Sequence, residues 1–380
     1  MKIAILTLPL HTNYGGILQC YALQTVLERM GYEVSVIEKK TKPVRLPLRL
    51  MPFCYGKRIL RNLIGHKCPV FYEQRYNRIQ HVIRQNTDVF IDQYIHLKRY
   101  QSFSNINEEE YDAIVVGSDQ IWRPKYFDVD KIENAYLKFA EKWNIKRVSY
   151  AASFGTDEWE YTAEQTSECG RLLKMFDAVS VRENSAIFSC KQYFDIEVQQ
   201  TLDPTLLLEK EDYIKLFETR NTPKSKGNLL CYILDESDEK KEIIQRIANE
   251  KGLNPFNVTA KIYDETVSLN ERIQPPLEQW LRGFYDADFV VTDSFHACVF
   301  SIIFQKQFIV LGNKCRGLDR FNSWLTFLSL KERLINSLYD YDAHISILNE
   351  NIDYISIKQK LDMERSRSLL FLMENLENKK

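Results

Sequence analysis

Residues 288–304 constrain the fold most, because two different patterns meet inside this one apolar stretch. It begins as a short run rich in strand-forming residues and ends as an apolar segment long enough for a helix. Between the two lie Thr292, Asp293 and Ser294, residue types that favour the start of a helix. The pattern predicts a buried strand followed at once by a helix, at the sheet edge where α/β proteins bind ligands.

His296 falls in the first turn of this expected helix. The free backbone N–H groups and the partial positive charge of a helix N-terminus favour an anion at that place. Taken alone, the position is equally consistent with a core histidine that bonds to a backbone carbonyl.

Strands and helices alternate along most of the remaining chain. The other expected strands cover 2–8, 32–38, 111–116, 147–152, 178–181, 229–234, 256–260 and 308–311. The expected helices cover 17–30, 162–175, 238–251, 277–285, 321–328 and 356–377. A chain of 380 residues is long enough for two α/β domains, which we place at 1–208 and 209–355. Segment 356–380 is expected to form an amphipathic helix that packs back on the first domain.

The loop before the first helix carries a second signal for a ligand. It contains Asn13, Tyr14, Gly15 and Gly16, at the same edge of the expected sheet. Adjacent glycines let a ligand approach the backbone closely, because neither has a side chain. The loop lacks the third glycine of the dinucleotide-binding fingerprint.

Polar residues follow several of the expected strands and would meet around one cleft. They are Asn13–Gly16, Asp119, Ser153, Arg182, Ser294–His296, Arg316 and Arg320. Arginines beside a helix N-terminus suit a small ligand with phosphate and carboxylate groups. A histidine and a carboxylate could divide acid and base duties. Each charged residue alone is more typical of a surface or a salt bridge, so the inference rests on their shared position.

Residues 39–100 interrupt the alternation and are strongly basic. They hold 14 Lys or Arg and 3 Asp or Glu, a net charge of +11 in a chain whose total is −1. Basic residues alternate there with Leu, Met, Phe and Tyr, which favours contact with an anionic membrane or a pyrophosphate-linked acceptor. A solvated insertion with basic helices is the alternative. The near-neutral total charge argues against nucleic acid as a partner.

The expected location is the cytoplasm, with peripheral contact to the inner face of the plasma membrane through 39–100 as a further hypothesis. No window approaches the ~18 uncharged apolar residues of a membrane span, and the N-terminus begins a strand without a secretory pattern. The 8 cysteines lack paired spacing, so we expect free thiols and neither a disulfide framework nor a zinc site.

Six short blocks of sequence lie at or near the expected strand ends. They are Thr12–Gln24, Val116–Trp122, Tyr150–Gly155, Val179–Glu183, Leu202–Leu207 and Thr292–Ala297. As a set, and in this order, they closely resemble the polysaccharide pyruvyltransferase family. The resemblance implies a GT-B-like α/β fold: two Rossmann-like domains face each other across a cleft, and a C-terminal helix returns to the N-terminal domain.

The resemblance also implies an activity. Family members transfer a pyruvyl group from phosphoenolpyruvate to a sugar and form a pyruvate ketal, many of them on precursors of cell-surface polysaccharides. The implied acceptor here is a sugar on a lipid-pyrophosphate-linked oligosaccharide. Phosphoenolpyruvate would be a co-substrate, and neither a metal nor another cofactor is implied.

Roles carry over residue by residue. His296 matches the family's acid/base histidine, Arg182 the arginine that holds the donor, and Phe295 a position whose backbone approaches the donor. Many members have Arg where this chain has Ser294, so we expect the loop 314–320 to supply that charge.

Arg316 and Arg320 are the candidates in that loop, on the donor side formed by the C-terminal domain. Asp119 is a weaker candidate for the base toward the acceptor hydroxyl. Acceptor-binding residues are expected on the N-terminal domain, namely Asn13, Tyr14, Gly15, Gly16 and Ser153.

Two other functions remain open at this point. One is a GT-B glycosyltransferase, whose nucleotide-sugar diphosphate would occupy the same helix N-terminus. The other is a non-catalytic assembly protein that binds a glycan or a lipid carrier. Turnover assays would separate the three functions. A pyruvyltransferase would use phosphoenolpyruvate, a glycosyltransferase would use a nucleotide-sugar, and an assembly protein would use neither.

Overall fold

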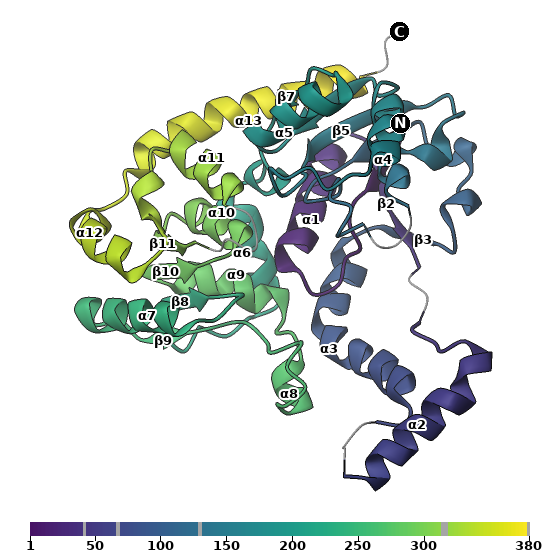
Figure 1. Ribbon diagram of the computed structural model, residues 1–380. Coiled ribbons are helices and arrows are strands. Elements are labelled where there is room, and N and C mark those ends of the chain that lie inside the picture. Colours follow the sequence, from purple (N-terminus) through teal and green to yellow (C-terminus); the bar gives the residue numbers. More distant parts are fainter. Residues whose placement is uncertain (41–42, 66–68, 128–130, 313–317, 378–380) are drawn as a thin grey trace.

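The structure, a computed structural model, describes residues 1–40, 43–65, 69–127, 131–312 and 318–377. These residues form two α/β domains, each with a parallel sheet and helices packed on it (Figure 1). The two-domain α/β organisation expected from the alternating pattern is therefore present.

The N-terminal sheet has the strand order β3-β2-β1-β4-β5-β6-β7. Its strands are β1 (Lys2–Leu6), β2 (Glu33–Lys39), β3 (Leu97–Tyr100), β4 (Ala113–Val116), β5 (Lys146–Ala152), β6 (Ala178–Val181) and β7 (Gln199–Gln200). Along β1, Ile3 and Ile5 enter the core on one face of the sheet, and Ala4 and Leu6 enter the core on the other. Burial on both faces explains why β1 is a continuous apolar run. The order changes direction between β1 and β4, which is where sheets of this kind bind ligands.

The C-terminal sheet has the order β12-β11-β10-β8-β9. Its strands are β8 (Leu229–Tyr232), β9 (Pro255–Phe256), β10 (Phe289–Thr292), β11 (Gln307–Leu311) and β12 (Leu334–Ile335). The strand and helix expected within 288–304 are both present, and β10 lies between β8 and β11 at the centre of this sheet.

Helices cover the sheets and join the domains. In the N-terminal half they are α1 (Tyr14–Arg29), α2 (Met51–Leu63), α3 (Tyr72–Tyr94), α4 (Ala163–Leu173) and α5 (Asn184–Ser189). After the short turn η7 (Pro204–Leu206) they are α6 (Lys210–Thr219), α7 (Asp238–Lys251), α8 (Leu269–Arg272), α9 (Leu277–Asp286), α10 (Phe295–Ile303), α11 (Asp319–Phe327), α12 (Leu338–Asn349) and α13 (Tyr354–Leu376). No helix among the described residues combines the length and the apolar character needed to cross a membrane.

Helix α1 starts earlier than the sequence indicated. Residues expected in the preceding loop, Tyr14, Gly15 and Gly16, form its first turn. Two adjacent glycines disfavour a helix locally, but tertiary contacts hold this turn. The ring of Tyr14 packs on Trp280 with centroids 5.5 Å apart, and its hydroxyl donates to the carbonyl of Pro275 at 2.6 Å.

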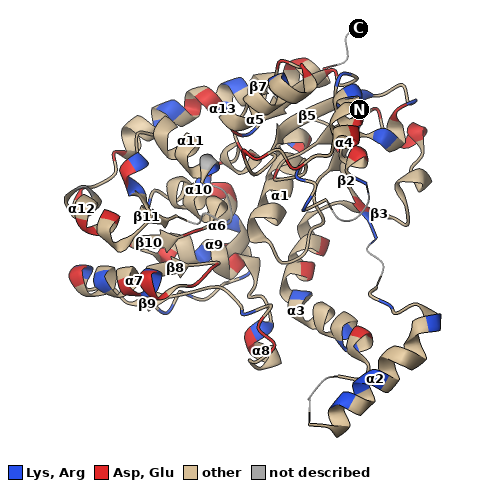
Figure 2. Ribbon diagram, viewed as in Figure 1, with Lys and Arg blue, Asp and Glu red and all other residues tan. Residues whose placement is uncertain are grey.

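The basic segment 39–100 is more than a solvated insertion. Its last residues form β3, which pairs with β2 as the edge strand of the sheet. Helix α3 contacts the other domain, because Gln274 donates its N–H to Ile83 (3.0 Å) and accepts from the side chain of Asn86 (2.8 Å). Prolines and basic residues obscured this pattern in the sequence. Helix α2 stands clear of both sheets, and it carries Lys and Arg but no Asp or Glu (Figures 1 and 2).

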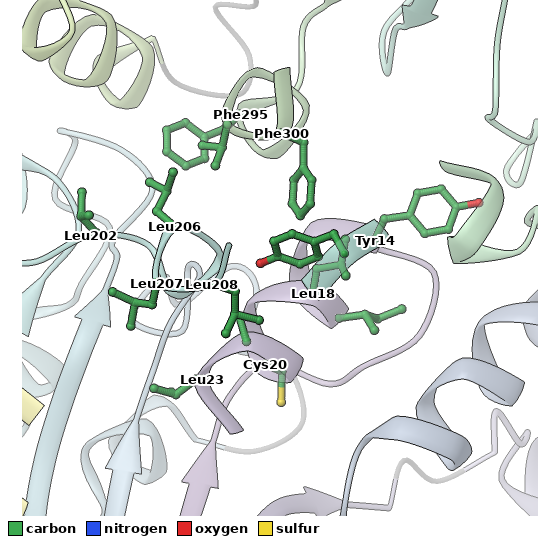
Figure 3. Packing of buried hydrophobic residues seen from close by; sticks show 14 of the residues in the cluster. Tyr14, Leu18, Cys20, Leu23, Leu202, Leu206, Leu207, Leu208, Phe295 and Phe300 are labelled. Atoms are coloured by element: carbon green, nitrogen blue, oxygen red, sulfur yellow. The ribbon is translucent and has the colours of Figure 1, made fainter. Parts of the chain in front are cut away.

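One apolar core runs through both domains. It is centred on η7 and the residues beside it, which lie between α1 and α10. Figure 3 shows this arrangement, with Leu202, Leu206, Leu207 and Leu208 between Leu18, Cys20 and Leu23 of α1 and Phe295 and Phe300 of α10. The domains are thus joined by packed side chains as well as by the chain itself.

Helix α13 returns from the C-terminal domain and packs along the N-terminal domain (Figure 1). The hydroxyl of Ser368 accepts a hydrogen bond from the buried N–H of Leu202 at 3.0 Å. Arg365 donates to the carbonyl of Leu206 at 2.8 Å. The returning helix expected from the sequence is confirmed, and it fixes the segment that leads into η7.

Replacing Ser368 with Ala is expected to lower the free energy of unfolding by about 1–3 kcal/mol, because a buried N–H at Leu202 loses its acceptor. Thermal or urea unfolding measures the change. Ser366→Ala is the matched control, since the Ser366 hydroxyl lies on the exposed side of the same helix and bonds only to Asp362. Equal unfolding midpoints for the two variants would assign no stabilising role to the bond.

Candidate active site

The first turns of α1 and α10, which belong to different domains, meet at the domain seam. A Cβ atom on Gly15 would lie 2.1 Å from Nδ1 and 2.2 Å from Cγ of His296. The imidazole therefore occupies the space that any other residue at position 15 would need. Gly16 is less restricted, because its nearest neighbour would be the side chain of Asn13 at 3.2 Å.

His296 is buried, with 7% of its surface exposed, and faces a carboxylate of the N-terminal half. Its Nε2 lies 3.5 Å from Oδ2 of Asp203, an ion-pair distance. Among the described residues, Nε2 has no hydrogen-bond partner. The core histidine bonded to a carbonyl, considered from the sequence, is therefore not supported at Nε2, which faces the carboxylate of Asp203.

Arg182 follows β6 and is surrounded by carboxylates. Its Nη1 donates to Oδ2 of Asp203 at 2.8 Å, and its Nη2 lies 3.5 Å from Oδ1 of Asp119. Its Nε lies 3.7 Å from Oε2 of Glu183. Within the described part of the chain, Nε and Nη2 make no hydrogen bond. Since buried donors are nearly always paired, these two are suited to a ligand.

A second buried guanidinium, that of Arg320 in α11, reaches the same place from the C-terminal domain. The guanidinium carbons of Arg182 and Arg320 lie 5.1 and 5.3 Å from the ring centroid of Phe295. Burial, followed by the positive charge of Arg182, lowers the pKa of Arg320 to about 10. An anion bound between the two arginines would relieve their repulsion.

Asp203 is the residue that connects the histidine to the arginine. Burial alone would raise its pKa, but interactions with His296, then with Arg182 and Thr205, hold the pKa well below its usual range. Asp203 is therefore a carboxylate at neutral pH. The sequence analysis did not assign it to the site, although it lies within the block Leu202–Leu207.

Glu183 was also not assigned, and it explains the position of Ser153. The Ser153 hydroxyl is buried and donates to Oε1 of Glu183 at 2.8 Å, while the N–H of Phe154 donates to the same oxygen at 3.1 Å. Ser153 thus holds Glu183, whose other oxygen has no hydrogen-bond partner among the described residues. Arg182 thus has three carboxylates close to it, those of Asp203, Asp119 and Glu183.

Asp119 adopts a backbone φ of 58°, which non-glycine residues rarely populate. Its carbonyl accepts from the N–H of Ser153 at 3.0 Å, so β5 holds it in this conformation. Its side chain is buried and lies near the first turn of α1, 3.5 Å from where a Cβ of Gly16 would be. Backbone strain of this kind is typical of functional sites.

The remaining predicted residues fall in different surroundings. Ser294 is the half-buried N-cap of α10, and its N–H donates to the hydroxyl of Thr292. Asn13 is the exposed N-cap of α1. Tyr14 is buried between the domains, where its hydroxyl is already bonded to Pro275. Arg316 lies outside the described residues.

The fold is shared with solved structures of the GT-B class. A putative UDP-N-acetylglucosamine 2-epimerase from Listeria monocytogenes has a TM-score of 0.52 and 10% identity, over 100% of this chain and 97% of that one. The S. aureus MnaA structure with UDP has a TM-score of 0.51 and 13% identity, over 100% and 99%. The UDP-GlcNAc 2-epimerase from Neisseria meningitidis bound to UDP-GlcNAc has a TM-score of 0.50 and 11% identity, over 99% of each chain. Identities this low show the fold alone, which is GT-B-like with two Rossmann-like domains.

Sequence gives the narrower assignment. The family model of polysaccharide pyruvyl transferases matches residues 13–314, so the chain belongs to this family of transferases. The family expected from the six blocks is confirmed. No curated protein matches the chain.

Gly15→Ala is expected to fold but to lose most of its activity. Alanine favours the helix by about 1 kcal/mol, yet its methyl group would collide with the ring of His296 and push α1 and α10 apart. Gly283→Ala is the matched control, because Gly283 is a helical glycine of α9 outside the site and the closest contact of its new Cβ would be Leu230 at 3.6 Å. Turnover and unfolding of both variants are the measurements. Similar turnover of the two would contradict a tight requirement at position 15.

Proposed function

We propose that the protein transfers a pyruvyl group from phosphoenolpyruvate to two hydroxyls of a sugar and forms a pyruvate ketal. The observation that carries this proposal is the convergence of Arg182 and Arg320, from different domains, on Phe295 beside His296. A small donor with both a phosphate and a carboxylate matches two buried guanidiniums at the N-terminus of α10.

In the proposed reaction, His296 delivers a proton to the methylene carbon of phosphoenolpyruvate. The neighbouring carbon becomes oxocarbenium-like, and one sugar hydroxyl attacks it and gives up its proton. Phosphate then leaves, and a second hydroxyl closes the ketal ring and releases another proton. Asp203 orients the imidazole and stabilises its protonated form, since it remains a carboxylate at 3.5 Å.

The arginines would neutralise the donor while the charge moves. Phosphate gains negative charge as it leaves, so guanidiniums already in place stabilise the transition state. Asp119 is the proposed base toward the acceptor, because it lies beside Arg182 and near the first turn of α1. The site side chains expose less than a tenth of their surface, so the domains would separate to admit the donor.

The proposed acceptor is a sugar on a lipid-pyrophosphate-linked oligosaccharide, a precursor of a cell-surface polysaccharide such as a capsule or an exopolysaccharide. The proposed location is the cytoplasm, at the inner face of the plasma membrane. The N-terminal domain would receive the acceptor through the first turn of α1, where Asn13 is exposed and Gly16 leaves room beside Asp119.

Phosphate release is the test of the reaction. We expect release from phosphoenolpyruvate in the presence of a sugar acceptor, and a loss of roughly 10²–10⁴-fold in turnover for His296→Ala. Cleavage of nucleotide-sugars in place of phosphoenolpyruvate would support a glycosyltransferase. Retained glycan binding without turnover of any donor would support a non-catalytic protein.

Donor binding can be separated from chemistry by calorimetry with phosphoenolpyruvate. Arg182→Ala and Arg320→Ala are each expected to weaken binding by roughly tenfold or more, because a charge-assisted hydrogen bond contributes about 1.5–3 kcal/mol. Arg246→Ala is the control and should bind as the wild type does, because Arg246 is a half-buried, ion-paired arginine on α7 outside the site. If Arg320→Ala binds as tightly as the control, Arg320 does not replace the arginine that many relatives carry at position 294.

A further inference from the structure

Helix α2 has no buried residue and stands at the far end of α3 from the domain seam (Figure 1). Two of its residues, Tyr55 and Arg58, contact the segment around the start of α3. The ring of Tyr55 packs on Phe71 with centroids 5.2 Å apart. Arg58 donates to both oxygens of Glu73, at 2.7 and 2.9 Å, and to the carbonyl of Val70. These contacts fix which face of α2 lies against α3.

The opposite face of α2 is apolar and open to solvent. Phe53, Leu60 and Leu63 share this face by their helical spacing and are 71, 63 and 77% exposed. Ile64, the residue that ends the helix, is 69% exposed. Clustered large apolar side chains on a helix face are unusual in water and mark a contact surface.

Charge identifies what that surface meets. Lys57 and Arg61 are exposed and lie along one edge of the apolar face by their helical spacing, and α2 contains no Asp or Glu (Figure 2). A second copy of this chain would bring the same cations together, without an acidic residue on α2 to pair them. A phospholipid surface offers anionic headgroups beside an apolar interior, which matches basic residues along the edge of an apolar stripe.

We infer that α2 lies in the headgroup region of an anionic membrane, with Phe53, Leu60 and Leu63 toward the acyl chains and with Lys57 and Arg61 at the phosphates. The surface is narrower than the whole basic segment 39–100. It does not include Arg58, which is occupied by Glu73.

Helix α2 is also connected, through α3, to the seam between the domains. Helix α3 has 23 residues, so it spans roughly 35 Å. Its residue Asn86 bonds to Gln274 of the C-terminal domain. Membrane attachment through α2 would therefore hold the two-domain body at a set distance from the lipid. This inference does not depend on the donor, since it would stand for any enzyme with a lipid-linked substrate.

The test is flotation of the full chain with vesicles of phosphatidylcholine, with and without phosphatidylserine. We expect binding to the anionic vesicles that weakens with salt. The triple variant Phe53→Ser/Leu60→Ser/Leu63→Ser should lower the partition coefficient between water and vesicles by roughly tenfold or more, because the variant buries less apolar surface in the lipid. Lys57→Gln/Arg61→Gln should lower it by roughly tenfold or more, with the preference for phosphatidylserine lost.

Matched variants on α13 and α7 control for general surface change. Ile355→Ser/Met363→Ser/Leu370→Ser removes three exposed apolar residues, and Lys241→Gln/Lys358→Gln removes two exposed charges. These should bind vesicles as the wild type does, and all variants should keep the wild-type unfolding midpoint. Three results would each overturn the inference. The wild type could stay unbound at low salt, or the α2 variants could bind like the controls. The protein could also form a dimer that only the α2 variants dissociate. Phosphate release with a water-soluble acceptor is expected to be the same for the wild type and for all these variants. The test of membrane binding is therefore independent of the test of the reaction.

Discussion

The contact between Gly15 and the ring of His296 is the constraint on which the site depends. It brings the first turns of two helices from different domains into van der Waals contact. Only then does Asp203, beside η7, come within 3.5 Å of the imidazole while it still bonds to Arg182. The absence of a side chain at Gly15 thus allows an imidazole, a carboxylate and a guanidinium to lie together.

The buried charges in this site depend on one another. Removing a charged group from water costs several kcal/mol unless a partner compensates. Arg182 has three carboxylates around it. The pKa of Arg320 is lowered by burial and then by the positive charge of Arg182, although the carboxylates of Asp119 and Glu183 act in the opposite direction. The network is also incomplete, since Nε and Nη2 of Arg182 lack hydrogen bonds among the described residues. An ion cluster that served stability alone would be expected to satisfy these donors.

Other elements hold the two domains in register around that contact. Helix α13 crosses back and fixes the segment before η7 through Ser368, and α3 bridges to the C-terminal domain through Asn86. The shared apolar core fills the space between α1 and α10. Helix α2 takes no part in this packing, so its exposed apolar face can serve an outside surface without loss of stability.

The sequence by itself determined the class of fold and the family. The apolar runs and their spacing predicted the alternating strands and helices, and polar residues at strand ends predicted that His296, Arg182 and Asp119 would share one edge. Six blocks identified the family that the residues 13–314 confirm. These are local signals, which depend on neighbours a few positions apart.

Only the tertiary structure decided which of these residues touch. Asp203 meets His296, and Ser153 supports Glu183. Arg182 and Arg320 reach the ring of Phe295 from different domains. The early start of α1 is similar, because contacts of Tyr14 with the other domain override the poor helix propensity of two glycines. Pairings of this kind join positions far apart in the chain, so neither periodicity nor spacing encodes them.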